Sequence, residues 1–126
     1  MAIMDDQGVR RLGPAASVRL AAGGLPVVVV EGEIDASNAA AVGRMLEALA
    51  EGMPRVVVDL RRLSFVDCAG AREFERFDRA RRAEGRLTRL LVAPGGAVAR
   101  FLNIAGLVTR LDVRTTLPAA EAAEAA

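Results

Sequence analysis

Continuous apolar runs predict the buried strands of this chain. Residues 27–30 and 55–60 each contain at least three valines in succession, which is typical of strands covered on both faces of a sheet. Shorter apolar stretches at 17–21, 87–92 and 107–113 predict further strands. Because glycine and proline separate 17–21 from 27–30, we expect these two strands to form a hairpin, with 17–21 at the edge of the sheet.

Apolar residues at helical spacing predict helices between and after these strands. The predicted helices extend from Ser37 to Gly52, from Cys68 to Gly85, from Pro94 to Gly106 and from Pro118 to Ala126. Ser37 has the side chain of a good N-cap, and Pro94 suits the first turn of a helix. A helix that joins two buried strands indicates a right-handed crossover between parallel strands.

The chain divides into a short lead-in and one domain. Residues 1–16 mix charge, glycine and Pro14 without a period, and we therefore predict a loosely ordered N-terminal segment. A chain of 126 residues suits one hydrophobic core. We expect that core to lie in a single domain over 17–126.

Composition limits the classes of function. The 17 basic and 16 acidic residues leave a net charge of +1, too weak a field to favour nucleic acid or an anionic membrane as partner. The longest apolar run is far shorter than the roughly 20 residues of a membrane-spanning helix. One cysteine and no histidine exclude an internal disulfide and a zinc site of the usual ligand types. We expect a cytoplasmic protein with no metal, no cofactor and no catalytic residue, since no nucleophile has an activating base.

Two carboxylates at strand ends mark the candidate functional surface. Asp35 follows the strand that begins at Val27, and Asp67 precedes the helix that begins at Cys68. If both lie on one rim of the sheet, the pair could bind a metal or perform acid–base chemistry. We favour helix capping and loop shaping for both, because nothing else in the sequence completes a metal shell.

Three other side chains near this rim have an alternative chemistry. The helix dipole favours a thiolate at Cys68, but Asp67 opposes it and no histidine is available as base, so we interpret Cys68 as a small, partly buried cysteine. Ser37 and Ser64 could accept a phosphate. We favour an N-cap for Ser37 and a loop hydroxyl bonded to the backbone for Ser64.

A cluster of arginines later in the same helix has two interpretations. Arg79, Arg81 and Arg82 could form a nucleic-acid patch, but acidic residues lie within helical pairing distance of them. We therefore predict a solvated, salt-bridged face.

Three segments resemble the STAS domain family, which includes bacterial anti-sigma factor antagonists and the cytosolic tails of some anion transporters. Residues 31–35 resemble the family's glycine–acid–aliphatic–aspartate turn, residues 56–67 its central strand and signature loop, and residues 98–107 its third helix and exit turn. Their order and spacing are specific together and span residues 27–113. The resemblance implies an α/β fold, with a mixed β-sheet of four to five strands and about four helices mainly on one face.

The resemblance also implies a phosphorylation switch, which this sequence has altered. In the family's signature, an aspartate is followed by two hydroxyl residues and a glycine, and a partner kinase phosphorylates the second hydroxyl. Asp67 and Gly70 are kept, whereas Cys68 and Ala69 replace the hydroxyls. Because Ala69 has no oxygen nucleophile, the phosphoacceptor position is lost, and the surface stays in the form that the family uses for binding its partner.

By this resemblance we expect a protein partner, namely an anti-sigma factor or a serine-kinase-type regulator. The predicted partner-binding residues are Asp35, Asp67, Cys68, Ala69, Gly70, Arg72, Glu73 and Arg76. Mixed charge after Gly70 stands where the family often presents an apolar patch, which favours a partner with its own charge pattern. Two alternatives stay open: an accessory subunit of an ABC-type membrane transport complex and a small-ligand sensor. A homodimer is also left open.

Overall fold

The computed structural model describes residues 2–4, 10–12, 16–21 and 26–117. Its strands are β1 (Ala2–Met4), β2 (Arg10–Leu12), β3 (Ala16–Ala21), β4 (Val27–Ile34), β5 (Arg55–Asp59), β6 (Leu63–Val66), β7 (Leu87–Leu91) and β8 (Val113–Arg114). Its helices are α1 (Ala39–Ala50), α2 (Cys68–Ala83), α3 (Ala97–Ile104) and the 3-10 helix η1 (Leu107–Thr109). None of the helices in this part of the chain is long and apolar enough to cross a membrane.

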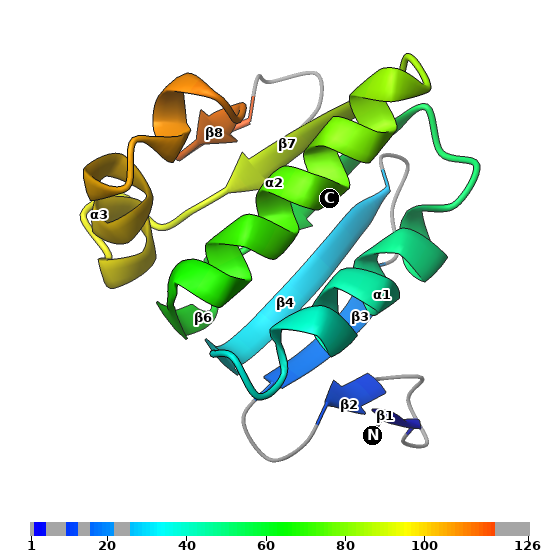
Figure 1. The fold of residues 1–126 in the computed structure, drawn as a ribbon, viewed down its shortest axis with the longest axis horizontal. Helices are drawn as coiled ribbons and strands as arrows, with labels where there is room; N and C mark the ends of the chain where they lie inside the picture. Colours follow the sequence, from blue (N-terminus) through cyan, green and yellow to red (C-terminus); the bar gives the residue numbers. More distant parts are fainter. Residues whose placement is uncertain (1, 5–9, 13–15, 22–25, 118–126) are drawn as a thin grey trace.

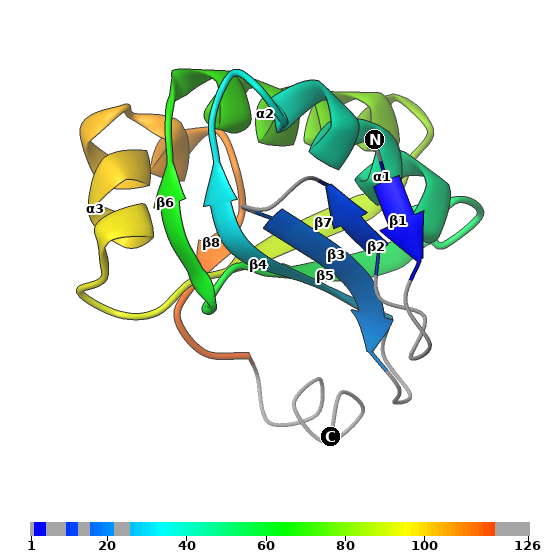
Figure 2. The ribbon, with the colours of Figure 1, turned by 90° about the horizontal axis from the view of Figure 1, so that it is seen from below.

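All described strands belong to one mixed sheet. Its order is β1-β2-β3-β4-β5-β7-β8, and β6 pairs with β4. Strands β1 to β4 are antiparallel neighbours, whereas β4, β5, β7 and β8 are parallel. The start of β4 pairs with β5 and its end pairs with β6, with a register shift between Gly32 and Glu33. The last residues of β4 are thereby brought beside β6 (Figure 2).

Helices α1 and α2 cover one face of this sheet (Figure 1). Valines of β4 and β5 meet the apolar sides of the two helices in the main core, which includes Val28, Val58, Leu46, Phe74 and Phe77. Helix α3 lies beside β6 at the edge of the layer (Figure 2). Alternate residues of the strands point to the opposite face. There Val27 and Val29 of β4, Val57 of β5 and Leu91 of β7 form a second, smaller cluster. The predicted α/β class and the placement of helices on one face are confirmed.

Two short strands occur among the described residues of the N-terminal region. Strands β1 and β2 pair with each other, and β2 pairs with β3, in the segment that we expected to be loosely ordered. The strand at 16–21 is therefore an inner strand and not an edge. Its antiparallel pairing with β4 confirms the predicted hairpin. These additions and β6 raise the strand number above the expected four to five.

Several boundaries differ from the sequence predictions. Residues 63–66, interpreted as a loop, form β6. In the strand predicted at 107–113, residues 107–109 form η1, and of these seven residues only Val113 belongs to a strand. Helix α1 begins after Asn38 and not after Ser37. Pro94 lies in the turn before α3, whose N-cap is Gly96. The helix predicted at 118–126 lies outside the described residues.

Candidate functional site

The carboxyl ends of β4 and β6 form a single rim. We define the rim as residues 35–38, which connect β4 to α1, together with residues 67–70, which open α2. The backbone N–H of Asp67 donates a hydrogen bond to the carbonyl of Ile34, 3.2 Å away, so the two strand ends are joined directly. Parallel strands end at the same edge of a sheet, and the structure thus brings Asp35 and Asp67 to the same edge, an arrangement that the sequence indicated as a possibility.

Asp67 and Gly70 set the geometry of the α2 N-terminus. Asp67 is the N-cap, and its Oδ1 accepts a hydrogen bond from the Gly70 N–H at 3.1 Å, which confirms the predicted capping role. Gly70 is buried between the two strand ends. A Cβ added there would lie 2.6 Å from a methyl of Val66 and 2.8 Å from a methyl of Ile34. Only glycine allows α2 to approach β4 and β6 this closely.

Asp35 shapes the other half of the rim. Its Oδ1 accepts hydrogen bonds from the Ser37 N–H at 2.8 Å and from the Ser37 hydroxyl at 2.5 Å. The bond from the Ser37 hydroxyl, followed by the one from its N–H, lowers the pKa of Asp35 from its ordinary value of 3.8. Asp35 is thus a turn-forming carboxylate that stays ionised near neutral pH.

Asn38 is a rim residue that the sequence prediction missed. Its side chain is 7% exposed. Its Oδ1 accepts a hydrogen bond from the Asp35 N–H at 3.0 Å, and its Nδ2 donates to the Glu33 carbonyl at 2.9 Å. Asn38 therefore holds the turn closed against the end of β4. An asparagine three residues after Asp35 was the available signal, but Ser37 was preferred as the cap.

The first turn of α2 presents small side chains to solvent. Cys68 is exposed, which corrects the prediction of a partly buried thiol, and Ala69 is half-buried. The cause is that Gly70 and Ala71 take the positions facing the core. Positions 68 and 69 therefore offer a thiol and a methyl group beside Asp67, and no hydroxyl.

The three charged residues predicted for this surface are not equivalent. Arg72 is exposed on the second turn of α2. Glu73 is only partly exposed. Its carboxylate lies so close to α1 that a Cβ added at Gly43 would overlap with it. Arg76 is exposed and pairs with Glu73 at 2.8 Å. Of these three residues, Arg72 and Arg76 are exposed to solvent near the rim, whereas Glu73 also fills the contact between the two helices.

The two serines near the rim both have hydrogen-bond partners. The hydroxyl of Ser64 donates to the Gly32 carbonyl at 3.0 Å, so the predicted bond to backbone is confirmed, although Ser64 lies on β6 and not in a loop. Ser37 caps no helix, and its hydroxyl serves Asp35. Phe65, between Ser64 and the rim, is 48% exposed and adds an apolar surface that the sequence prediction missed because β6 itself was not expected.

No group of three or more potential metal ligands occurs among the residues that the structure describes. Asp35 and Asp67 direct oxygens to backbone N–H groups of their own turns. Their arrangement stabilises two adjoining turns beside a small, exposed helix N-terminus. Chemically, such a rim can dock another molecule through charge and hydrogen bonds.

The comparisons with known proteins agree with this fold. A crystal structure of an anti-sigma factor antagonist from Mycobacterium paratuberculosis is similar, with a TM-score of 0.70 and 22% identity over 90% of this chain and 98% of that chain. A putative anti-sigma factor antagonist from Thermotoga maritima has a TM-score of 0.64 and 17% identity over 78% and 86% of the two chains. The unphosphorylated form of the anti-sigma factor antagonist SpoIIAA has a TM-score of 0.59 and 17% identity over 86% and 94%.

A search among curated proteins found no match. The family model of the STAS domain matches residues 20–120, from β3 through the described C-terminal strand. This range includes the whole rim and both helices of the main core. The chain therefore belongs to the STAS domain family.

Proposed function

We propose that this chain is a non-enzymatic regulatory module of the anti-sigma factor antagonist type. Its partner is an anti-sigma factor or a serine-kinase-type regulator, and the rim is the surface that binds it. The fold supports this assignment, because the similar structures are those of anti-sigma factor antagonists. The rim supports it as well, since it is an exposed helix N-terminus with a fixed backbone.

The observation that carries the proposal is the side chain at position 69. Ala69 lies in the first turn of α2, two residues after the capping carboxylate of Asp67. Phosphoryl transfer to a side chain needs an oxygen nucleophile, and this alanine supplies none. A phosphate would add about two negative charges beside Asp67 and change what the turn can dock. The module we propose therefore binds its partner without a serine switch, and its activity follows its own abundance or its partner's state.

The first test introduces charge at this position. Ala69→Asp places a carboxylate in the first turn of α2, where the helix dipole tolerates it. The unaltered chain and this variant are each used to capture proteins from extracts of the cells that express the chain. We expect a histidine-kinase-like ATPase or a sigma-factor regulator to be retained by the unaltered chain and lost with Ala69→Asp.

A matched control separates the rim from general charge effects. Ala80→Asp makes the same substitution on an exposed position of the same helix, far from the rim, and we expect it to retain the partner. Capture of a transporter ATPase instead would favour the accessory-subunit alternative. A partner set that is insensitive to Ala69→Asp would exclude the rim as the binding surface.

A second test restores the missing oxygen. Ala69→Ser is incubated with the captured regulator and ATP, and phosphate is located by mass spectrometry. We expect phosphate at position 69 in the variant and no phosphate in the unaltered chain. Phosphate at Ser37 or Ser64 of the unaltered chain would overturn the claim that the module has no serine switch.

A further inference from the structure

The face of the sheet opposite α1 and α2 holds a cleft with its own chemistry. The cleft has a volume of about 450 Å³, within the range usual for small-molecule sites. The described residues that line this open-face cleft are Arg19, Ala21, Val27, Val29, Val57, Asp59, Arg61, Arg62, Leu91 and Leu117. They come from β3, β4, β5, β7 and the segments after β5 and β8, and none of them belongs to the rim.

The floor of the open-face cleft is apolar. Val27, Val29, Val57 and Leu91 form a cluster separate from the main core, and each is less than 10% exposed. They lie on neighbouring strands, where β4 pairs with β5 and β5 pairs with β7. No aromatic side chain is among the described lining residues. The floor thus suits an aliphatic group and offers no surface for stacking a nucleotide base.

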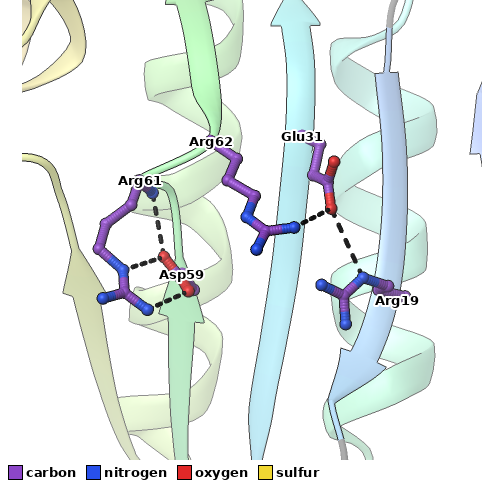
Figure 3. Close-up of polar contacts among 5 residues, drawn as sticks. All are labelled: Arg19, Glu31, Asp59, Arg61 and Arg62. Carbon is purple, nitrogen blue, oxygen red and sulfur yellow. Dashed lines mark hydrogen bonds and ion pairs between the residues drawn. The ribbon is translucent and has the colours of Figure 1, made fainter.

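One side of the cleft has more guanidinium groups than carboxylates. Glu31 is shared by two arginines, with contacts of 3.5 Å to Arg19 and 3.4 Å to Arg62 (Figure 3). These contacts are long for a charge-assisted pair. Arg19 and Arg62 are 32% and 66% exposed, so an anion in solution can reach both.

The third arginine of the cleft is already neutralised. Asp59 accepts hydrogen bonds from Arg61 Nε at 3.0 Å and Nη2 at 2.9 Å, and also from the Arg61 N–H at 3.0 Å (Figure 3). Burial tends to raise the pKa of Asp59, but the Arg61 bonds and the charges of Arg61 and Arg62 lower it overall. Among the described residues, three guanidiniums therefore face the carboxylates of Glu31 and Asp59, and the excess positive charge lies with Arg19 and Arg62.

We propose that the open-face cleft binds a small amphipathic anion, a carboxylate head group on an aliphatic chain. The carboxylate binds the guanidinium N–H groups of Arg19 and Arg62 other than Arg19 Nε and Arg62 Nη1, which contact Glu31; a planar anion matches the guanidinium geometry. The aliphatic chain lies over Val29 and Val57. This site is independent of the rim and of the function proposed there.

Decanoate is the probe for the test, because it combines a carboxylate with an unbranched chain. Titration of the full chain is followed by methyl NMR. We expect shift changes at the methyls of Val27, Val29, Val57 and Leu91, which belong to the cleft floor. Removing one charged contact in Arg62→Gln should weaken binding about tenfold. Arg79 is an exposed residue of α2, on the opposite face of the sheet from the cleft. The control substitution Arg79→Gln should therefore leave the affinity for decanoate unchanged.

Two further ligands separate the head group from the chain. Decanol keeps the chain without the charge, and acetate keeps the charge without the chain. We expect both to bind more weakly than decanoate. Equal binding of decanol, or unchanged affinity in Arg62→Gln, would overturn the proposal.

Other occupants of the face give distinct results. A concentration-dependent dimer whose contacts map to Arg19, Arg62 and Leu91 would mean that a second copy fills the face, and would overturn the proposal. Attachment to phosphatidylserine vesicles without binding of free decanoate would assign the positive charge to a lipid surface, and would overturn it as well. Shift changes confined to Val28 and Val30, which face the main core, would also contradict it.

Discussion

The two ends of α2 are held by polar networks of opposite kinds. At the N-terminus, Asp67 bonds to Gly70 and Asp35 bonds to Ser37, over sequence separations of two or three residues, and both carboxylates have access to solvent. At the C-terminus, Arg81 is 5% exposed. Its guanidinium donates to Thr88 Oγ1 at 2.7 Å and to the carbonyls of Leu87, Met53 and Ala50 at 2.8, 3.0 and 3.3 Å.

The difference separates the end of α2 that we propose to bind a partner from the end that stabilises the fold. Arg81 joins the end of α1 to the start of β7 and lies 5.6 Å from the ring centre of Phe77. Burial is the main cause of the lowered pKa of its guanidinium. Four acceptors receive hydrogen bonds from this one side chain, whereas each rim carboxylate serves only its own turn. We infer that charge can change at the rim with little loss of stability, and cannot change at Arg81.

The largest effect is expected from Arg81→Met. The substitution keeps much of the side-chain volume and leaves three carbonyls and one hydroxyl without this donor. We expect a loss of about 3 kcal/mol in the free energy of unfolding, because the lost hydrogen bonds to Thr88 and Ala50 are buried and those to Met53 and Leu87 are partly buried. Urea unfolding followed by circular dichroism measures it. Arg79→Met is the matched control on an exposed position of the same helix, and equal stability of the two variants would contradict the structural role of Arg81.

Gly70→Ala tests the buried residue in the α2 half of the rim. Its new methyl would lie 2.6 Å from Val66 and 2.8 Å from Ile34. The helix gains some propensity from alanine, but overpacking dominates, and we expect a net loss of about 2 kcal/mol. Gly96→Ala, where the nearest atom is 3.3 Å away, should cost less in the same unfolding assay. A neutral Gly70→Ala would mean that α2 can shift away from the two strands.

The same contrast between local and distant bonds explains how much could be predicted from sequence. The valine runs of β4 and β5, the extent of α2 and the cap at Asp67 depend on neighbouring residues, and all three were predicted. Arg81 was predicted to lie on a solvated face, because acidic residues stand at helical spacing from it. Its acceptors at Ala50 and Met53 are 31 and 28 residues away, so no local pattern could indicate its burial.

Short elements were missed for a related reason. Strand β6 has four residues, and its pattern of burial has exposed positions at Ser64 and Phe65. Such a segment forms a strand only because the end of β4 leaves β5 and becomes free to pair with it. The choice of Asn38 over Ser37 as the cap residue likewise depends on the Glu33 carbonyl at the end of β4. Both features became visible only with the tertiary structure.

Asp67→Ala should have a smaller effect than either substitution above. It removes the side-chain acceptor of the Gly70 N–H and a negative charge at the positive end of the helix dipole. Loss of an N-cap costs about 1 kcal/mol. Asp67→Asn keeps an oxygen acceptor and should recover most of the loss in urea unfolding. If Asp67→Ala were as damaging as Arg81→Met, the rim would be a structural element in the same sense as the far end of α2.

The smallest expected effect is a shift in the pKa of Asp35. It tests whether the hydrogen bonds of the rim act only within their own turn, as the structure indicates. The Ser37 hydroxyl and N–H lower the pKa of Asp35 below 3.8. The stability from these bonds is therefore present above the ordinary pKa and is lost as the pH falls through the lowered pKa. Ser37→Ala removes the hydroxyl donor, and we expect the pKa of Asp35 to rise toward 3.8 in a titration of carboxyl carbon shifts by NMR.

Ser64→Ala is the control for this titration, because the Ser64 hydroxyl donates to the Gly32 carbonyl and to no carboxylate in the described contacts of the rim. The Asp35 titration should be unchanged in that variant. A midpoint that moves with Ser64→Ala but not with Ser37→Ala would show that the two halves of the rim are coupled through the strands. The rim would then share the long-range character of the Arg81 network, and charge introduced at Ala69 would change the stability of the fold as well as the partner binding that we propose.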